Sequence, residues 1–334
     1  MTQINGQCRL AARPVGLPTA SDWEYVEEPA PEPQDGQFLV RVEYLSLDPA
    51  MRAWMNPGRS YIAPVGIGEV MRAAGIGTVV ESRHPLYSTG DCVQGVFGVQ
   101  RYALSDGGGV TQVDIALAPP PVHLGALGLS GLTAYFGLLE IGRPEPGQTV
   151  VVSGAAGSVG SVAGQIARIK GARAIGITGG PDKCSWLVDE LGFDAAIDYK
   201  AGDTSAQLRA HAPGGVDVFF DNVGGTVLDD VLTRLARGAR VVISGAISQY
   251  NATEAPRGPA NYMQLLVARA TMAGFVIFDY AERFPAALAE LAAWLRSGEL
   301  RSREHIVEGD IEQFPEALLK LFKGENTGKL VLAI

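Results

Sequence analysis

The chain has 334 residues, more than the roughly 250 to 300 at which a single hydrophobic core stops growing, so two domains are expected. Hydrophobic residues make up 47% and charged residues 19% of the sequence, which excludes extended disorder. The formal net charge of −9 excludes a basic surface for nucleic acid, so any anionic ligand must be bound at a local site.

Export and membrane insertion are not expected. Residues 1–16 carry polar side chains throughout and contain no apolar stretch of signal-peptide length. Glycine, serine, threonine and Glu140 interrupt the apolar stretch 124–141, which therefore predicts a buried helix. Cys8, Cys92 and Cys184 are odd in number and form no CxxC pair, as is typical of the cytoplasm.

Residues 38–98 have the pattern of an all-β module. Val40, Val42 and Tyr44 alternate with charged residues, and two further strand-like segments, 76–80 and 92–97, are separated by glycine-rich turns. A run of prolines at 119–121 precedes the apolar helix. We therefore predict a first domain over residues 1–123.

From residue 148 onward, apolar strand-like runs alternate with amphipathic helices. Continuous apolar strands separated by helices predict an α/β fold with a Rossmann-type, doubly wound parallel sheet, over residues 124–299. Glycines just past the periodic segments predict the helix ends, at Gly171, Gly192, Gly238 and Gly298. Residues 300–334 are expected to return to the β-rich domain and complete it with a strand over 329–333. The predicted strands of the parallel sheet are 149–153, 174–178, 195–198, 216–221, 240–244 and 272–277.

A glycine-rich loop joins the first of these strands to its helix. Gly154, Gly157 and Gly160 allow the backbone to turn sharply and approach a pyrophosphate, whose charge meets the positive end of the helix. The alternative is a turn that serves only packing. The order strand, turn, helix and second strand favours dinucleotide binding. The candidate residues are Ala155, Gly157, Ser158, Val159 and Gly160.

The second strand ends at Thr178, Gly179 and Gly180, without the carboxylate that an NAD site usually places there. Lys183 follows and can reach a 2′-phosphate, so Gly179 and Lys183 predict NADPH as the cofactor. Two alternatives stay open at this point. Lys183 can be an ordinary solvated lysine of a first helical turn, and Asp182 can serve NAD.

The sequence predicts no metal site. The three cysteines are isolated, and His84, His123, His211 and His305 have no metal-ligand spacing to a partner. Without a Lewis acid, nothing stabilises the alkoxide of an unactivated alcohol. Hydride transfer to an electrophilic carbon is therefore the expected chemistry.

Six segments together resemble the zinc-independent medium-chain dehydrogenase/reductases, in particular the leukotriene/prostaglandin reductases, plant alkenal reductases and bacterial curcumin reductases. The resemblance spans nearly the whole chain in the expected order. The segments are residues 47–52 (LDPAMR), 90–93 (GDCV), 155–160 (AAGSVG), 220–225 (FDNVGG), 245–251 (GAISQYN) and 326–329 (NTGK).

This resemblance implies a GroES-like substrate domain, a Rossmann cofactor domain and a homodimer. It also implies that Lys183 and Tyr199 hold the adenosine phosphate and ribose, and that Tyr250 lies near cofactor and substrate. Further cofactor contacts are implied for Asn222, Gly245, Ile247, Ser248 and Asn326.

The chain departs from the family pattern at Ala50, where a tyrosine is common. A pocket hydroxyl is thus missing, and Tyr61, in a Ser-Tyr segment also seen in the bacterial curcumin reductases, becomes a candidate replacement. Trp54 is a further candidate for the pocket wall, although scattered aromatic residues are more often ordinary core.

The predicted reaction is delivery of hydride from NADPH to the β-carbon of an α,β-unsaturated ketone or aldehyde, an activated alkene. Negative charge then develops on the carbonyl oxygen, and Tyr250, Tyr61 or a cofactor ribose hydroxyl can donate a hydrogen bond to it. Either tyrosine can instead serve packing alone. The alternative functions are an NADPH-dependent quinone reductase and a non-catalytic NADPH-binding sensor or adaptor.

Overall fold

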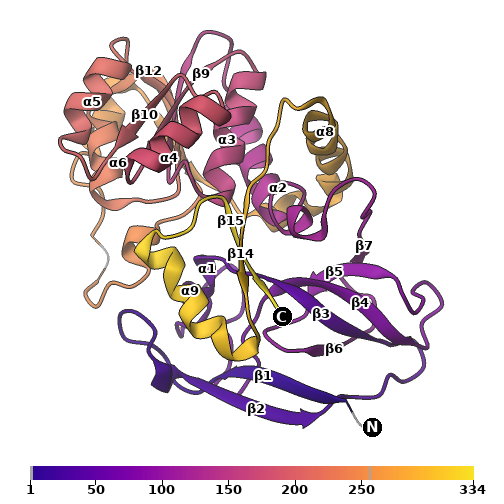
Figure 1. Ribbon diagram of the computed structural model, residues 1–334. Coiled ribbons are helices and arrows are strands. Elements are labelled where there is room, and N and C mark those ends of the chain that lie inside the picture. The colour runs from indigo at the N-terminus through magenta and orange to yellow at the C-terminus, as the bar shows by residue number, and fades with distance from the viewer. Residues whose placement is uncertain (1–2, 256) are drawn as a thin grey trace. The chain divides into compact units, whose positions relative to one another are not determined.

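The computed structural model describes residues 3–255 and 257–334, which form two compact units (Figure 1). The first unit covers the chain up to Leu124 and again Glu304–Ile334, and the second is Gly125–Arg303. The second unit is therefore inserted into the sequence of the first.

The second unit is built on a six-stranded parallel sheet. Its strand order is β10-β9-β8-β11-β12-β13, which is the doubly wound Rossmann arrangement and confirms the predicted fold class. The direction of strand order reverses between β8 and β11, the point where such folds bind ligands. The strands are β8 (Thr149–Ser153), β9 (Arg173–Thr178), β10 (Ala195–Asp198), β11 (Val216–Asp221), β12 (Leu235–Ile243) and β13 (Thr271–Gly274).

Helices cover this sheet on both faces. The connection from β8 to β9 crosses in one direction and that from β11 to β12 in the other, and right-handed crossovers in opposite directions place their helices on opposite faces. The sheet contributes continuous buried apolar runs such as Val150, Val151 and Val152. The helices of this unit are α2 (Leu129–Phe136), α3 (Ser158–Ile169), α4 (Pro181–Ser185), α5 (Thr204–His211), α6 (Gly225–Leu232), α7 (Met263–Ala268) and α8 (Phe284–Ser297).

One predicted helix end in this unit was wrong, and two strands have bounds that differ by several residues from the predicted ones. Strand β12 spans Leu235–Ile243 instead of 240–244. Gly238 lies inside β12, not after a helix, and its positive φ of 78° falls where the pairing register with β11 shifts. Glycine there permits a bulge, which the sequence pattern alone does not distinguish from a helix cap. Strand β13 ends at Gly274 instead of 277, because the chain turns into a 3₁₀ helix over Ile277–Arg283.

The first unit is rich in antiparallel β-structure. Strands β1 and β2 form a separate ribbon, and the larger sheet has the order β14-β15-β3-β4-β5-β7, with β6 also pairing with β3. The C-terminal strand β15 is antiparallel to β3, with Val331 opposite Ser46. The elements are β1 (Ile4–Leu10), β2 (Trp23–Pro29), β3 (Phe38–Ser46), α1 (Ala50–Trp54), β4 (Ala74–Ser82), β5 (Cys92–Val96), β6 (Tyr102–Ser105), β7 (Thr111–Gln112), β14 (Glu304–Glu308), α9 (Phe314–Lys323) and β15 (Lys329–Ala333).

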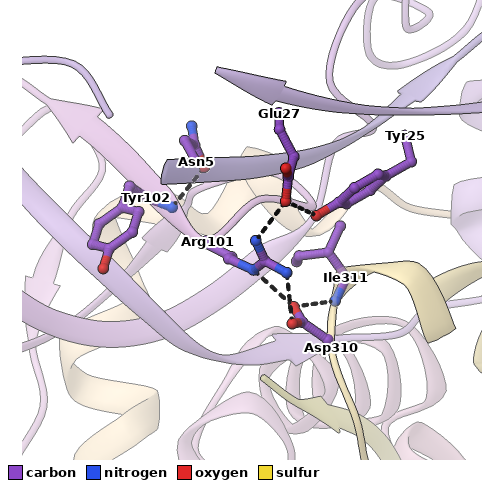
Figure 2. A network of polar contacts seen from close by, with 7 residues as sticks. All are labelled: Asn5, Tyr25, Glu27, Arg101, Tyr102, Asp310 and Ile311. Atoms are coloured by element: carbon purple, nitrogen blue, oxygen red, sulfur yellow. Dashed lines mark hydrogen bonds and ion pairs between the residues drawn. The ribbon is translucent and has the colours of Figure 1, made fainter. Parts of the chain in front are cut away.

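A polar network fastens the returning C-terminal segment to the N-terminal strands (Figure 2). Arg101 donates from Nε and Nη2 to the two carboxylate oxygens of Asp310, at 3.0 and 2.7 Å, and from Nη1 to Glu27 at 3.3 Å. Asp310 in turn accepts from the backbone N–H of Ile311 at the start of the turn before α9. The hydrogen bond from Arg101 lowers the pKa of Asp310. This bidentate pair holds residues far apart in sequence within one unit.

Two positively charged residues from the segments that resemble the family, Lys329 and Arg52, hold the backbone of this unit together. Lys329 is 2% exposed and donates to Leu47 O at 3.0 Å and to Asp48 Oδ1 at 2.6 Å. Arg52 is equally buried, and it donates to the backbone oxygens of Gly16 and Pro14. These buried cations are thus fully engaged in holding the chain and are not available to a ligand.

Candidate functional site

The glycine-rich loop closes tightly onto helix α3. The N–H groups of Ala155 and Gly157 are already paired, with Ile177 O and Gly154 O. A Cβ at Gly160 would lie 2.4 Å from Gly154 O, so only glycine lets the helix approach the loop this closely. The first turn of α3, which begins at Ser158, then presents N–H groups that have no partner within the helix.

One hydroxyl in this loop points to an anionic ligand. The Oγ atom of Ser158 is buried and has no hydrogen-bond partner among the described residues. Buried polar groups are normally hydrogen-bonded, so an unsatisfied hydroxyl in the first turn of a helix calls for a partner that the protein does not provide. A pyrophosphate oxygen would meet this requirement. The roles of Ser158, Val159 and Gly160 toward the cofactor stay predictions.

The ends of β8 and β11 are locked together at the switch point. Ser153 donates from Oγ to the fully buried carboxylate of Asp221 at 2.6 Å and accepts from the backbone N–H of Asn222 at 2.8 Å. Asn222 also donates from its side chain to Ser153 O at 2.7 Å. Burial raises the pKa of Asp221, while the bonds from Ser153 and the backbone N–H groups of Gly224 and Val223 lower it. The carboxylate thus fixes the backbone of the loop that carries Asn222.

The segment 244–250 lies on that loop. Ile247 and Ser248 donate backbone N–H groups to Asn222 O and Val223 O, and the Ser248 hydroxyl donates to Val223 O at 2.6 Å. The Tyr250 hydroxyl accepts from the N–H of Ala246 at 3.2 Å. A Cβ at Gly245 would lie 3.1 Å from that hydroxyl. The structure therefore brings Asn222, Gly245, Ile247, Ser248 and Tyr250 together at the switch point.

A second cluster forms where β9 and β10 end. Lys183, in α4, is half-buried, and a Cβ at Gly179 would lie 2.9 Å from both Tyr199 Cε1 and Lys200 Cε. Burial lowers the pKa of Lys183, and the nearby Lys200 lowers it further. The two ammonium groups repel each other, and a dianionic ligand between them would relieve that repulsion.

Two carboxylates, Asp198 and Asp182, lie close to this cluster in the sequence. Asp198 Oδ1 accepts from the backbone N–H groups of Gly180 and Lys200, both at 2.9 Å, so this oxygen is occupied by the turn. Asp182 is exposed in the first turn of α4. Lys200 is the residue that the sequence analysis missed. Its signal was a cation directly after Tyr199, at the end of a strand adjacent to β9.

Two predicted site residues belong to the first unit. Tyr61 is 53% exposed and accepts from Trp54 Nε1 at 3.1 Å. Asn326 donates from its side chain to Gly328 O at 2.9 Å, in the turn before β15. Ala50 is the first residue of α1. Their roles toward cofactor and substrate stay predictions.

Neither a metal-binding cluster nor a membrane-spanning helix is found in the residues that the structure describes. Across residues 3–255 and 257–334, His, Cys, Asp and Glu side chains do not gather in any group of three able to hold a metal ion. In the same residues, no helix combines the length and apolarity of a membrane span.

Comparison with known proteins identifies the family. Residues 6–113 match the N-terminal domain of oxidoreductase family and residues 158–293 the zinc-binding dehydrogenase family. The chain is 41% identical to the NADPH-dependent curcumin reductase of Escherichia coli, over 99% of this chain and 97% of the relative. It is 36% identical to mouse prostaglandin reductase 1, over 95% of each protein.

Among solved structures, the crystal structure of CurA from Vibrio vulnificus in complex with NADPH superimposes with a TM-score of 0.93, at 44% identity over 98% of both chains. A coverage of 98% means that the likeness extends through both units. The chain therefore belongs to the zinc-independent medium-chain dehydrogenase/reductase family, together with the curcumin and prostaglandin reductases.

Proposed function

We propose that this protein is an NADPH-dependent reductase of the carbon-carbon double bond in α,β-unsaturated ketones or aldehydes. The observation that carries the proposal is the full-length similarity to a curcumin reductase, at 41% identity. Curcumin is itself an α,β-unsaturated ketone, and the similarity to prostaglandin reductase 1 points to the same chemical class.

The cofactor assignment has support from the chain's own residues. The unsatisfied Ser158 hydroxyl and the close approach at Gly160 fit a pyrophosphate. Lys183 and Lys200 fit a 2′-phosphate, since two mutually repelling cations lie where an NAD site places an acid. Tyr199 exposes its ring beside them and would cover the adenosine end.

NADPH, when bound, supplies the hydride. The protein's part is to orient the substrate and to stabilise the negative charge that develops on its carbonyl oxygen. A single well-placed donor to such an oxygen contributes roughly a hundred- to thousandfold in rate. We assign this donor to Tyr61 or Tyr250. The Tyr250 hydroxyl lies at the switch point, where it accepts from the N–H of Ala246. The Tyr61 hydroxyl accepts from an indole, so it has its own proton to donate.

The test is NADPH oxidation with a matched panel of substrates. Enones and enals should be reduced at the double bond, with mass spectrometry showing a gain of two hydrogens and a retained carbonyl. The saturated ketones of the same carbon skeleton are the control and should not react. A clear preference for quinones would replace the proposal by quinone reduction, and NADPH binding without turnover on any member would indicate a sensor or adaptor.

A further inference from the structure

The loop that carries Tyr61 is fixed by one tryptophan. Trp54 ends helix α1, and its backbone oxygen accepts from the N–H of Val65 at 2.9 Å, which closes the base of the loop between them. Its indole Nε1 donates to the Tyr61 hydroxyl at 3.1 Å, near the tip of the same loop. Trp54 therefore holds the loop at two points.

Arg72 stabilises this arrangement from outside the loop. Its guanidinium lies 5.7 Å from the centroid of the Trp54 ring, within the range of a cation-π contact. Its Nη1 donates to Ala63 O at 2.9 Å, two residues beyond Tyr61. The Trp54 ring also packs against the hydrophobic core of its unit. The indole has little freedom to leave Tyr61.

The direction of the hydrogen bond decides where the tyrosine proton goes. An indole N–H can only donate, so the Tyr61 oxygen must accept and its own O–H stays available. Among the described residues, no hydrogen bond uses that O–H. The Trp54 contact thus leaves an exposed phenol whose O–H is not used by another described residue.

The contact between Trp54 and Tyr61 bears on the hydroxyl that is missing at Ala50. Ala50 and Trp54 are four residues apart on α1 and so share one helix face. The small side chain of Ala50 leaves that face without a hydroxyl of its own. The Tyr61 hydroxyl is brought to the same face by the indole of Trp54.

We propose that Trp54 is a positioning residue that orients the Tyr61 hydroxyl as the hydrogen-bond donor to the substrate carbonyl oxygen. This inference rests on the proposed enone reduction. According to this proposal, Trp54 affects turnover and not cofactor binding, and it does so only through Tyr61. A tryptophan that served packing alone would affect the protein equally whether or not Tyr61 carried its hydroxyl.

The contact itself is tested without any activity. Indole N–H signals are recorded by NMR on wild-type, Trp54→Phe and Tyr61→Phe proteins, the first variant assigning the Trp54 signal. Loss of the hydroxyl should move that signal upfield, since a hydrogen-bonded N–H loses its acceptor. An unchanged signal in Tyr61→Phe would overturn the proposal.

The catalytic consequence is tested by a double-mutant cycle on one enone substrate. Tyr61→Phe should lower kcat roughly a hundredfold, as expected for loss of one donor to an oxyanion. Trp54→Phe should lower kcat about fivefold, the effect of one ordinary hydrogen bond, with little change in KM. In the Tyr61→Phe background, Trp54→Phe should have no further effect.

The matched control is Trp23→Phe, which shortens another partly buried tryptophan of the same unit, packed edge-on against Phe314 at 5.3 Å. It should leave kcat unchanged. An equal loss from Trp54→Phe in both backgrounds, or a change in KM alone, would overturn the positioning role. If the wild-type protein reduces no enone, the proposed function fails, while the NMR result still decides whether Trp54 holds Tyr61.

Discussion

Replacing Lys183 by alanine tests the phosphate site at the end of β9. A charge-assisted hydrogen bond contributes about 1.5 to 3 kcal/mol, which corresponds to roughly ten- to 150-fold in affinity. Lys183 is half-buried, whereas Lys200 is exposed and more strongly screened by water. We therefore expect Lys183→Ala to weaken NADPH binding at least about tenfold and Lys200→Ala by no more than about fivefold.

The measurement is the dissociation constant for NADPH and for NADH, obtained by calorimetry on the same preparations. NADH lacks the 2′-phosphate, so its affinity should stay nearly unchanged in both variants. Lys170→Ala serves as the control, since Lys170 pairs with Glu290 after the C-terminal end of α3. Equal losses for NADPH and NADH would refute the phosphate role, and so would an unaltered NADPH affinity in Lys183→Ala.

The preference for NADPH should also depend on pH. Burial and the neighbouring Lys200 lower the pKa of Lys183, so its ammonium group loses its proton earlier than an ordinary lysine as the pH rises. The ratio of NADPH to NADH affinity should fall over that range in the wild-type protein. In Lys183→Ala the fall should be absent, and its persistence would assign the pH dependence to another group.

Three further changes test the structure. Lys329→Met should lower the free energy of unfolding by about 3 to 5 kcal/mol, because it leaves Asp48 without its ion-pair partner. Urea unfolding measures this loss, with Lys323→Met on the surface helix α9 as the control. An equal loss in the control would contradict the prediction. Burial lowers the pKa of His123 below 6.5, so the folded state resists the proton that the unfolded chain accepts. Stability should therefore be full above pH 6.5 and decline as the pH falls below it. Urea midpoints should decline less steeply for His123→Asn, and equal slopes in the two proteins would contradict this cause. The family resemblance implies a homodimer, and we expect helix α7 to take part in it, because Leu266 is 70% exposed on this helix, which precedes the edge strand β13 in the chain. Leu266→Glu should therefore give monomers in analytical ultracentrifugation, and an unchanged dimer would place the interface elsewhere.

The parallel sheet could be predicted from sequence because its strands are buried on both faces. The central residues of these strands, such as 150–152 (VVV) and 218–220 (VFF), are apolar without interruption, and glycine-rich turns follow the strands, which favours a buried parallel strand. The ribbon of β1 and β2 escaped prediction for the opposite reason. Both strands carry many polar side chains, so they lack the apolar pattern of a buried strand, and their antiparallel pairing is seen only in the structure.

The candidate site was partly predictable. The phosphate loop, Lys183 and the residues around Asn222 lie in local motifs, so their positions follow from the order of strands and turns. Lys200 and Trp54 do not belong to such motifs. The role assigned to Lys200 depends on its nearness to Lys183, and the role assigned to Trp54 depends on its contact with Tyr61. Both neighbours are seen only in the folded chain.

The insertion of the second unit into the first has a consequence for biosynthesis. Strand β15 (Lys329–Ala333) lies between β14 and β3, so the larger sheet of the first unit cannot be completed until these residues have left the ribosome. Gly125–Arg303 is continuous and can form all its own sheet contacts earlier. During synthesis, strand β3 therefore lacks this neighbour until about 280 later residues have been added, and a chain that stops after Arg303 would have a complete parallel sheet in its second unit and an open sheet edge in its first.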